Sequence, residues 1–347
     1  MRKLLKSLTG VVLILMIIGV CASYWFSQRY NGKPLAFSTL PLRIKIEKGQ
    51  GIRSLANTLA TNGVKISAVE LEVAARARGD QAKIKSGVYE FKTAVNIEQL
   101  LDKVISGETL QFEVRLVEGW TFKQYRESLA KSADLKQDTV ALSDAQIMKA
   151  IGAPESKPEG LFFPDTYMFP LGSSDLDVYK RAYKEQQNRL TKIWASRPAD
   201  SPLKTPYEAL TLASIVEKET GREEDRDKVA AVFLNRLKIG MMLQSDPTTI
   251  YGLGGDFDGN LRRKDLKADT PFNTYTRNGL TPTPISMPGA NSLKAIMNPA
   301  NIAALYFVAR GDGTSEFSDD LGAHNRAVNK FQRGGGVAKS ATKSAAQ

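Results

Sequence analysis

The stretch TPYEALTLASIVEKET (residues 205–220) decides how the larger part of this chain folds. Thr205 and Pro206 form a suitable helix cap and first turn, and Gly221 follows as a stop signal. Between them, residues 209–216 carry no charged side chain. The stretch therefore predicts an apolar helix that ends in acidic residues.

Those acidic residues are Glu217 and Glu219. At 100° per residue they lie about 200° apart around a helix, so both cannot point into one cleft. A carboxylic acid held against apolar neighbours has a raised pKa and can donate a proton near neutrality. A solvated helix end, together with Lys218, is the alternative interpretation. Spacing alone does not decide between the two glutamates.

Upstream of this helix, residues 42–110 predict a small α/β module. Strand and helix patterns follow one another there as RIKIEKG, IRSLANTLATNGV, AVELEVAARARG, SGVYEF and IEQLLDKVISG. A strand followed by helices of this size resembles a LysM-type glycan-binding module. A generic packing module is the alternative.

Residues 111–333 predict a second, larger mixed α/β domain, so the expected fold class is α+β. FEVRLVEGW and NIAALYFVARGDG read as strands, PEGLFFPDTYMF as an aromatic-rich loop, and residues 241–291 as a long irregular loop. Helical patterns cover TFKQYRESLAKSA, LDVYKRAYKEQQNRLTKIWASR, DRDKVAAVFLNRLKIG and EFSDDLGAHNRAVNKFQ. Residues 334–347 are expected to be a flexible tail.

Composition restricts the chemistry. The 347 residues include one His and one Cys, which excludes a Cys/His zinc site, and Cys21 lies in the most apolar stretch. An enzyme with this composition would use carboxylates, hydroxyls, Lys or Arg, and we expect no metal and no cofactor. The net charge of +11 fits nucleic acid, anionic lipid or an acidic polymer equally well.

The N-terminus predicts a membrane anchor. Basic residues in 1–7 precede a charge-free run over 8–26, close to the roughly 20 residues that cross a bilayer. This arrangement predicts a cytoplasmic start, one transmembrane helix, a polar tether over 27–41, and the remaining chain outside the cytoplasm, where nucleic acid is an unexpected partner. A cleaved signal peptide and a lipoprotein signal at Cys21 are alternatives, but the residues before both cleavage positions fit poorly.

Two segments of the predicted loop carry polar groups suited to binding sugar hydroxyls and N-acetyl groups. They are MLQSDPTTIYGLG, with Gln244, Ser245 and Asp246, and PFNTYTRNGLTPTPISMPG, with Asn273, Thr274 and Tyr275. Ordinary turn chemistry is the alternative for both. Tyr251 and Tyr275 are candidates for stacking on sugar rings, whereas His324 with Asn325 reads as structural.

The motifs ASIVEKET, VFLNRLKIGMMLQSDPTTIYGLG and FNTYTRNGLTPTPISMPG, with LVEG and FPDTY upstream, resemble the YceG-like family of endolytic murein transglycosylases. The resemblance implies a single-pass inner-membrane enzyme with a LysM-like subdomain and a periplasmic catalytic domain. It implies internal cleavage of nascent peptidoglycan strands at MurNAc-GlcNAc bonds, 1,6-anhydro-MurNAc ends, and termination of glycan elongation. Penicillin-binding proteins are implied as partners.

The resemblance also assigns site residues. It places the catalytic acid on Glu219, because Glu219-Thr220 resembles the Glu-Ser step of other lytic transglycosylases, with Glu217 as the reserve. The substrate-binding residues expected from the motifs and loops are Asn235, Gln244, Ser245, Asp246, Tyr251, Asn273, Thr274, Tyr275 and Asn325. Thr281, where the family commonly has proline, and Phe272 depart from the family pattern.

Three other functions remain open at this stage. A non-catalytic, membrane-anchored peptidoglycan-binding scaffold would share the anchor and the small module. A hydrolase would leave reducing ends in place of anhydro ends. A protein that binds lipid or nucleic acid would cluster its basic residues, which are scattered here.

Overall fold

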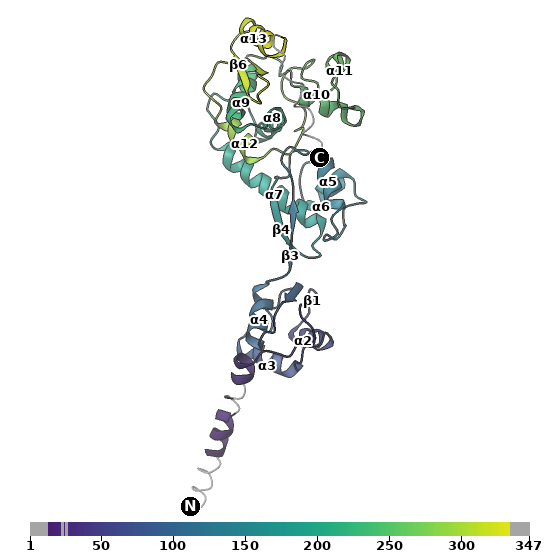
Figure 1. The fold of residues 1–347 in the computed structure, drawn as a ribbon, viewed down its shortest axis with the longest axis vertical. Helices are drawn as coiled ribbons and strands as arrows, with labels where there is room; N and C mark the ends of the chain where they lie inside the picture. Colours follow the sequence, from purple (N-terminus) through teal and green to yellow (C-terminus); the bar gives the residue numbers. More distant parts are fainter. Residues whose placement is uncertain (1–12, 22–23, 25–26, 334–347) are drawn as a thin grey trace, which may run out of the picture. The chain divides into compact units, whose positions relative to one another are not determined.

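The computed structural model describes residues 13–21, 24 and 27–333 (Figure 1). The predicted cytoplasmic start, parts of the predicted anchor and the predicted tail lie outside the described residues. Within the described residues, no helix combines the length and the apolar character needed to cross a membrane. The mixed helix and strand content expected from the sequence is confirmed.

The chain forms two compact units. The first comprises the chain up to Glu113 together with Met168–Ser173, and the second comprises Val114–Tyr167 and the chain from Ser174 onward. Strands β3 (Gln111–Arg115) and β4 (Thr166–Pro170) pair with each other, and the unit boundary falls within both strands.

The first unit is a strand–helix–helix–strand arrangement followed by a helix. Its strands pair antiparallel, with Leu42 opposite Phe91. Alternate residues of β1 are buried, because successive side chains of a strand point to opposite faces. A short π-helix, η1 (Gln28–Gly32), precedes this arrangement. Its elements are β1 (Leu42–Ile46), α2 (Ile52–Thr61), α3 (Ala68–Ala77), β2 (Gly87–Phe91) and α4 (Ile97–Ser106).

One apolar core holds the first unit together. Buried side chains come from each of β1, α2, α3, β2 and α4, among them Ile44, Leu55, Leu71, Tyr89 and Leu100. Capping boxes fix where α3 and α4 begin, and Gly107 ends α4 in the left-handed conformation that favours glycine. The sequence predictions for these elements are confirmed.

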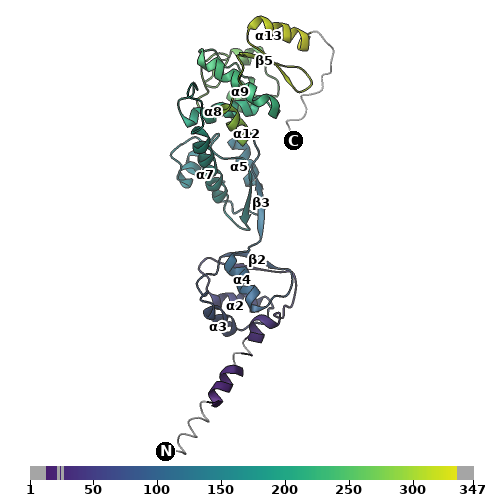
Figure 2. The same ribbon diagram turned by 90° about the vertical axis from the view of Figure 1, so that its left-hand side faces the viewer.

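The second unit is mostly helical. Helices α8, α9 and α12 contact one another at its centre, and α7 contacts α8 and α12. β5, in the hairpin with β6, contacts α9, and α13 packs against this hairpin; Figure 2 shows α13 next to β5. The elements are α5 (Phe122–Ala130), α6 (Asp144–Ile151), α7 (Asp175–Trp194), α8 (Pro206–Glu219), α9 (Glu223–Lys238), α10 (Asp246–Leu253), η2 (Gly254–Asp256), α11 (Arg263–Lys267), α12 (Ala290–Met297), β5 (Tyr306–Ala309), β6 (Ser315–Ser318), α13 (Leu321–Val328) and η3 (Asn329–Arg333).

Three element predictions for this unit are wrong. The stretch 241–291 contains α10 and α11, and in α10 Pro247 sits in the first helical turn, where its missing N–H costs nothing. Residues 315–318 form β6, because they pair with β5 across a turn rather than extend the last helix. The aromatic-rich loop contains β4, which pairs with the distant strand β3.

Helix α8 is the central element of the second unit. Every residue from Ala209 to Val216 is buried, as expected for a helix that is apolar all round. Ser214 within it accepts a hydrogen bond from Ile285 N at 2.9 Å, and its own carbonyl accepts one from Ser286 Oγ at 3.1 Å. The proline-rich segment around residue 285 is therefore fixed against the helix that carries Glu217 and Glu219.

Candidate active site

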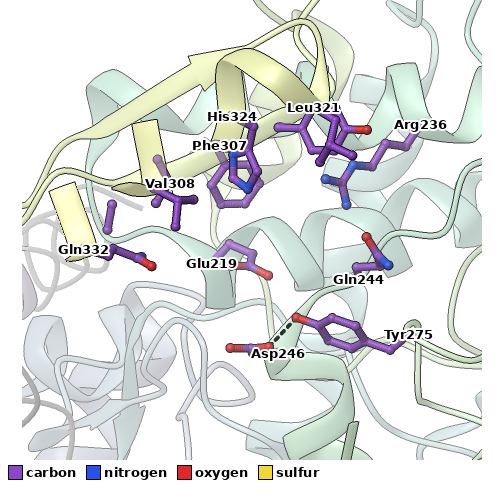
Figure 3. Close-up of a pocket in the computed structure, with 13 residues that line it drawn as sticks. Glu219, Arg236, Gln244, Asp246, Tyr275, Phe307, Val308, Leu321, His324 and Gln332 are labelled. Atoms are coloured by element: carbon purple, nitrogen blue, oxygen red, sulfur yellow. Dashed lines mark hydrogen bonds between the residues drawn. The ribbon is translucent and has the colours of Figure 1, made fainter. Parts of the chain in front are cut away.

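A cavity of about 450 Å³ lies at the C-terminal end of α8 (Figure 3). Its walls come from the last turn of α8, from α9, from the start of α10, from Tyr275, and from β5 with α13. The residues that line it are Glu219, Arg236, Gln244, Asp246, Tyr275, Tyr306, Phe307, Val308, Ala309, Leu321, His324, Val328 and Gln332.

Glu219 is the acid of this cavity. Its Oε1 accepts a hydrogen bond from Ser245 Oγ. Burial raises the pKa of Glu219 to about 7, and the negative charge of Asp246 acts in the same direction. The Ser245 hydrogen bond and the Arg236 charge oppose this rise only in part. Near neutral pH the cavity therefore holds a carboxyl group that can both donate and accept a proton.

Glu217 faces away from this cavity. Its Oε2 accepts hydrogen bonds from Gly289 N at 3.0 Å and from Ser292 Oγ at 2.7 Å, at the start of α12. A carboxylate in this position satisfies free N–H groups and interacts favourably with the helix dipole. The two glutamates thus have separate surroundings, as their angular separation on α8 predicts.

The segment Gln244–Asp246 forms the wall beside Glu219. Gln244 has a φ of 50°, a left-handed conformation that is uncommon for a residue other than glycine. Its backbone N donates to Thr274 O at 3.1 Å, which fixes this turn. Asp246 accepts a hydrogen bond from the Tyr275 hydroxyl at 2.5 Å, the contact drawn in Figure 3.

Asn273 and Thr274 support this wall from behind, and neither lines the cavity. Thr274 Oγ1 accepts from Ser245 N at 3.0 Å and bonds with Thr248 Oγ1 at 2.8 Å. Asn273 is fully buried, and its amide nitrogen donates to three backbone carbonyls, the shortest at 2.7 Å to Ala268. These contacts join the two loop motifs into one rigid structure.

Three other residues that the sequence assigns to the cleft lie elsewhere. Asn235 donates to the carbonyls of Ile302 and Ala304 at 3.0 and 3.1 Å, and it does not line the cavity of Glu219. Asn325 is exposed on α13 and also lies outside that lining. Tyr251 lines a second cavity, where its hydroxyl donates to Glu159 Oε2 at 3.0 Å.

The second cavity, of about 700 Å³, lies between α10 and the start of α5. Its buried carboxyl group belongs to Glu159, whose Oε1 accepts from Phe122 N at 3.0 Å. Burial raises the pKa of Glu159 to about 7. Because both oxygens of Glu159 accept hydrogen bonds from the protein, we interpret this group as a structural link between α5 and α10.

Similarity to known proteins shows the family of this chain. The model of the YceG-like family matches residues 44–330. The chain belongs to the YceG-like family. It is similar to the endolytic murein transglycosylase of Bacillus subtilis, with 30% identity over 311 residues that cover 85% of this chain and 86% of that protein.

Two further relatives extend the comparison. An endolytic murein transglycosylase of Streptococcus pneumoniae is 26% identical and covers 82% of this chain, which in turn spans 57% of that longer protein. The crystal structure of a protein described as YceG-like, from Listeria monocytogenes, has a TM-score of 0.50 and 29% identity, and the match covers 82% of this chain and 98% of that one. The expected family is therefore confirmed.

Five polar or aromatic residues of the cavity in this YceG-like chain were not predicted from the sequence to line it: Arg236, Tyr306, Phe307, His324 and Gln332. Arg236 projects from α9, Tyr306 from β5 and His324 from α13. The His324 ring stacks on Tyr306 with centroids 5.2 Å apart, and burial lowers its pKa. The sequence did contain an indication that Arg236 is buried, because it continues the helical spacing of buried Val229 and Phe233 on α9.

Proposed function

We propose that this chain is an endolytic lytic transglycosylase. It cleaves MurNAc-GlcNAc bonds within peptidoglycan strands and leaves 1,6-anhydro-MurNAc ends. Membership of the YceG-like family and the names of its relatives support this function. The observation that carries it is Glu219, a carboxyl group with a pKa near 7 in a cavity large enough to hold part of a glycan.

The reaction needs one group that acts first as an acid and then as a base. Protonated Glu219 donates its proton to the glycosidic oxygen as the bond from that oxygen to C1 of MurNAc breaks. The resulting carboxylate then accepts the proton of the muramyl C6 hydroxyl, whose oxygen attacks C1 and closes the anhydro ring. No water is consumed, and Glu219 returns to its starting form.

The surroundings of Glu219 suit this cycle. The hydrogen bond from Ser245 holds Oε1 and leaves Oε2 to carry the proton. A pKa near 7 makes the donation and the return of the proton similarly favourable at neutral pH. The Gln244 side chain and the backbone around it provide groups for the sugar's N-acetyl substituent.

A hydrolase is the second candidate, because Asp246 is another carboxylate in the same cavity. Most glycoside hydrolases use two carboxylate residues. The hydrogen bond from Tyr275 occupies one Asp246 oxygen and favours a supporting role for that residue. The two reactions differ by one water in the product.

The test uses the full-length protein and purified sacculi. Mass spectrometry of the released fragments should find 1,6-anhydro-MurNAc ends with the unchanged protein. With Glu219→Gln the amount of anhydro ends should fall by at least about 10²-fold, which is the lower limit of what a general acid–base catalyst contributes. Reducing ends in place of anhydro ends would support the hydrolase, and undiminished anhydro ends with Glu219→Gln would refute the assignment of Glu219.

The location and partners are part of the same proposal. The charge-free run over 8–26 with basic residues before it supports a single-pass anchor in the inner membrane and a periplasmic active site. The strand–helix–helix–strand arrangement of the first unit supports a LysM-like glycan-binding role. Internal cleavage of nascent strands would terminate their elongation, and penicillin-binding proteins that extend those strands are the partners we expect.

A further inference from the structure

Arg236 is a buried cation in the wall of the Glu219 cavity. The residue is 6% exposed. Nε donates to Leu305 O at 2.7 Å and Nη1 donates to Leu243 O at 2.6 Å, while the guanidinium lies over the Tyr306 ring at 5.4 Å from the centroid. Neutral backbone and an aromatic ring therefore fix its position without neutralising its charge.

The charge of Arg236 is unpaired within the described part of the chain. No carboxylate there forms a salt bridge with it, and Nη2 donates no hydrogen bond to a described residue. Figure 3 shows the guanidinium directed into the cavity between Gln244 and Leu321. A buried charge without a partner costs several kcal/mol, so an anionic or strongly accepting group of a ligand is its natural complement.

We propose that Arg236 binds the lactyl–peptide arm of the muramic residue, through a carboxylate or carbonyl oxygen of that arm. This inference rests on the proposed function. The sugars of the strand offer neutral hydroxyl and acetamido groups, whereas the arm on the muramic ring carries carboxylates. Glu219 would act on the bond at C1 of that same ring, and Arg236 lies in the same cavity, so one bound muramic residue can reach both side chains.

The planar fork of arginine suits this ligand better than lysine would. Nε and Nη1 of Arg236 hold Leu305 O and Leu243 O, and Nη2, with two N–H groups, is left for an oxygen of the ligand. Gln244 lies beside it on the same wall. The site therefore selects muramyl-peptide glycan over a glycan of N-acetylglucosamine alone.

The test measures binding in full-length protein that carries Glu219→Gln, so that the probes are not cleaved. One probe is a glycan oligosaccharide with peptide-bearing muramic residues, and the other is an N-acetylglucosamine oligosaccharide of equal length. Adding Arg236→Gln should weaken binding of the first probe by roughly 10- to 100-fold, the effect of one charge-assisted hydrogen bond. Binding of the second probe should change less than twofold.

Arg236 also holds two backbone carbonyls, so Arg236→Gln could unfold the protein. Arg236→Lys keeps the charge and replaces Arg236→Gln in the test if that variant does not fold. The affinity of Arg236→Lys for the peptide-bearing probe should fall a few-fold, and its affinity for the N-acetylglucosamine probe should stay the same. Equal losses for both probes, or no loss for either, would overturn the proposal. If the unchanged protein forms anhydro ends but the Arg236 variants lose affinity equally for both probes, only the role of Arg236 is overturned. If the Arg236 variants lose affinity for the peptide-bearing probe alone but the unchanged protein forms no anhydro ends, only the catalytic function is overturned.

Discussion

Ser245 Oγ donates a hydrogen bond to Glu219 Oε1, and this contact joins the last turn of α8 to the residue that precedes α10. Ser245 is itself buried and fixed by Thr274 Oγ1. Two distant segments of the sequence thus meet at one carboxyl group. The Ser245 hydrogen bond fixes the position of this carboxyl group, and it lowers the pKa of Glu219 against the larger, opposite effect of burial.

Replacing Ser245 with alanine should shift the pH dependence of activity upward. The Ser245 hydrogen bond lowers the pKa of Glu219, so its loss raises that pKa above about 7. A general acid must be protonated, and the alkaline fall in kcat/KM should therefore occur at higher pH. Activity at pH 7 should also fall by roughly tenfold, because the carboxyl group is less well oriented. A pH profile of anhydro-end formation checks this, and an alkaline fall at unchanged or lower pH would contradict it.

Asp246→Asn should shift the same alkaline fall in the opposite direction. The negative charge of Asp246 raises the pKa of Glu219, so its removal lowers that pKa. The fall in kcat/KM should then begin at lower pH than in the unchanged protein. Tyr275→Phe is the matched control, because it removes the hydrogen bond and leaves the Asp246 charge in place. If both variants shift the profile equally, the charge of Asp246 is not the cause.

The local part of this site could be predicted from the sequence. The apolar run of α8, the 200° separation of Glu217 and Glu219, and the two polar loop motifs all depend on neighbouring residues. The structure brings Gln244, Asp246 and Tyr275 into one wall with Glu219. It places Asn273 and Thr274 behind that wall as its support, a distinction that depends on which face of each loop is buried.

The remaining part of the site depends on contacts between distant segments. The opposite wall of the cavity consists of β5 and α13, and β5 pairs with β6, which the local pattern assigned to a helix. Arg236 and His324 reach the cavity only because α9 and α13 pack against β5. The ring of Tyr251 could stack on a sugar, but α10 positions this side chain in the second cavity. No local spacing encodes these placements.

Glu217 should be required for stability rather than for chemistry. Glu217→Ala leaves Gly289 N and the Ser292 hydroxyl without their acceptor, at a cost of about 1–3 kcal/mol in the free energy of unfolding. Glu217→Gln keeps one acceptor oxygen and should cost less. Below the unfolding temperature both variants should keep kcat within a few-fold of the unchanged value. Thermal unfolding and the anhydro-end assay together check this, and abolished activity in folded Glu217→Gln would make Glu217 the acid instead.

Glu219→Gln should make the folded protein more stable at pH 8 while it removes activity. The pKa of Glu219 is about 7 in the folded chain against an ordinary value of 4.5, so the folded state binds this proton more tightly than the unfolded state does. Stability of the unchanged protein is therefore lost as pH rises from about 4.5 to about 7, and the loss persists above 7. This difference corresponds to at most about 3.4 kcal/mol, and solvent contact of the half-buried side chain reduces it to roughly 1–2 kcal/mol.

Glutamine has nearly the same shape, accepts the Ser245 hydrogen bond and carries no charge at any pH, so the variant avoids this loss. Denaturation midpoints of the two proteins should therefore coincide near pH 4.5 and separate in favour of Glu219→Gln by pH 8. Glu159 also has a pKa raised to about 7, but it is present in both proteins and cancels from the comparison. A variant that is less stable at pH 8, or a difference independent of pH, would show that burial of Glu219 does not set its pKa.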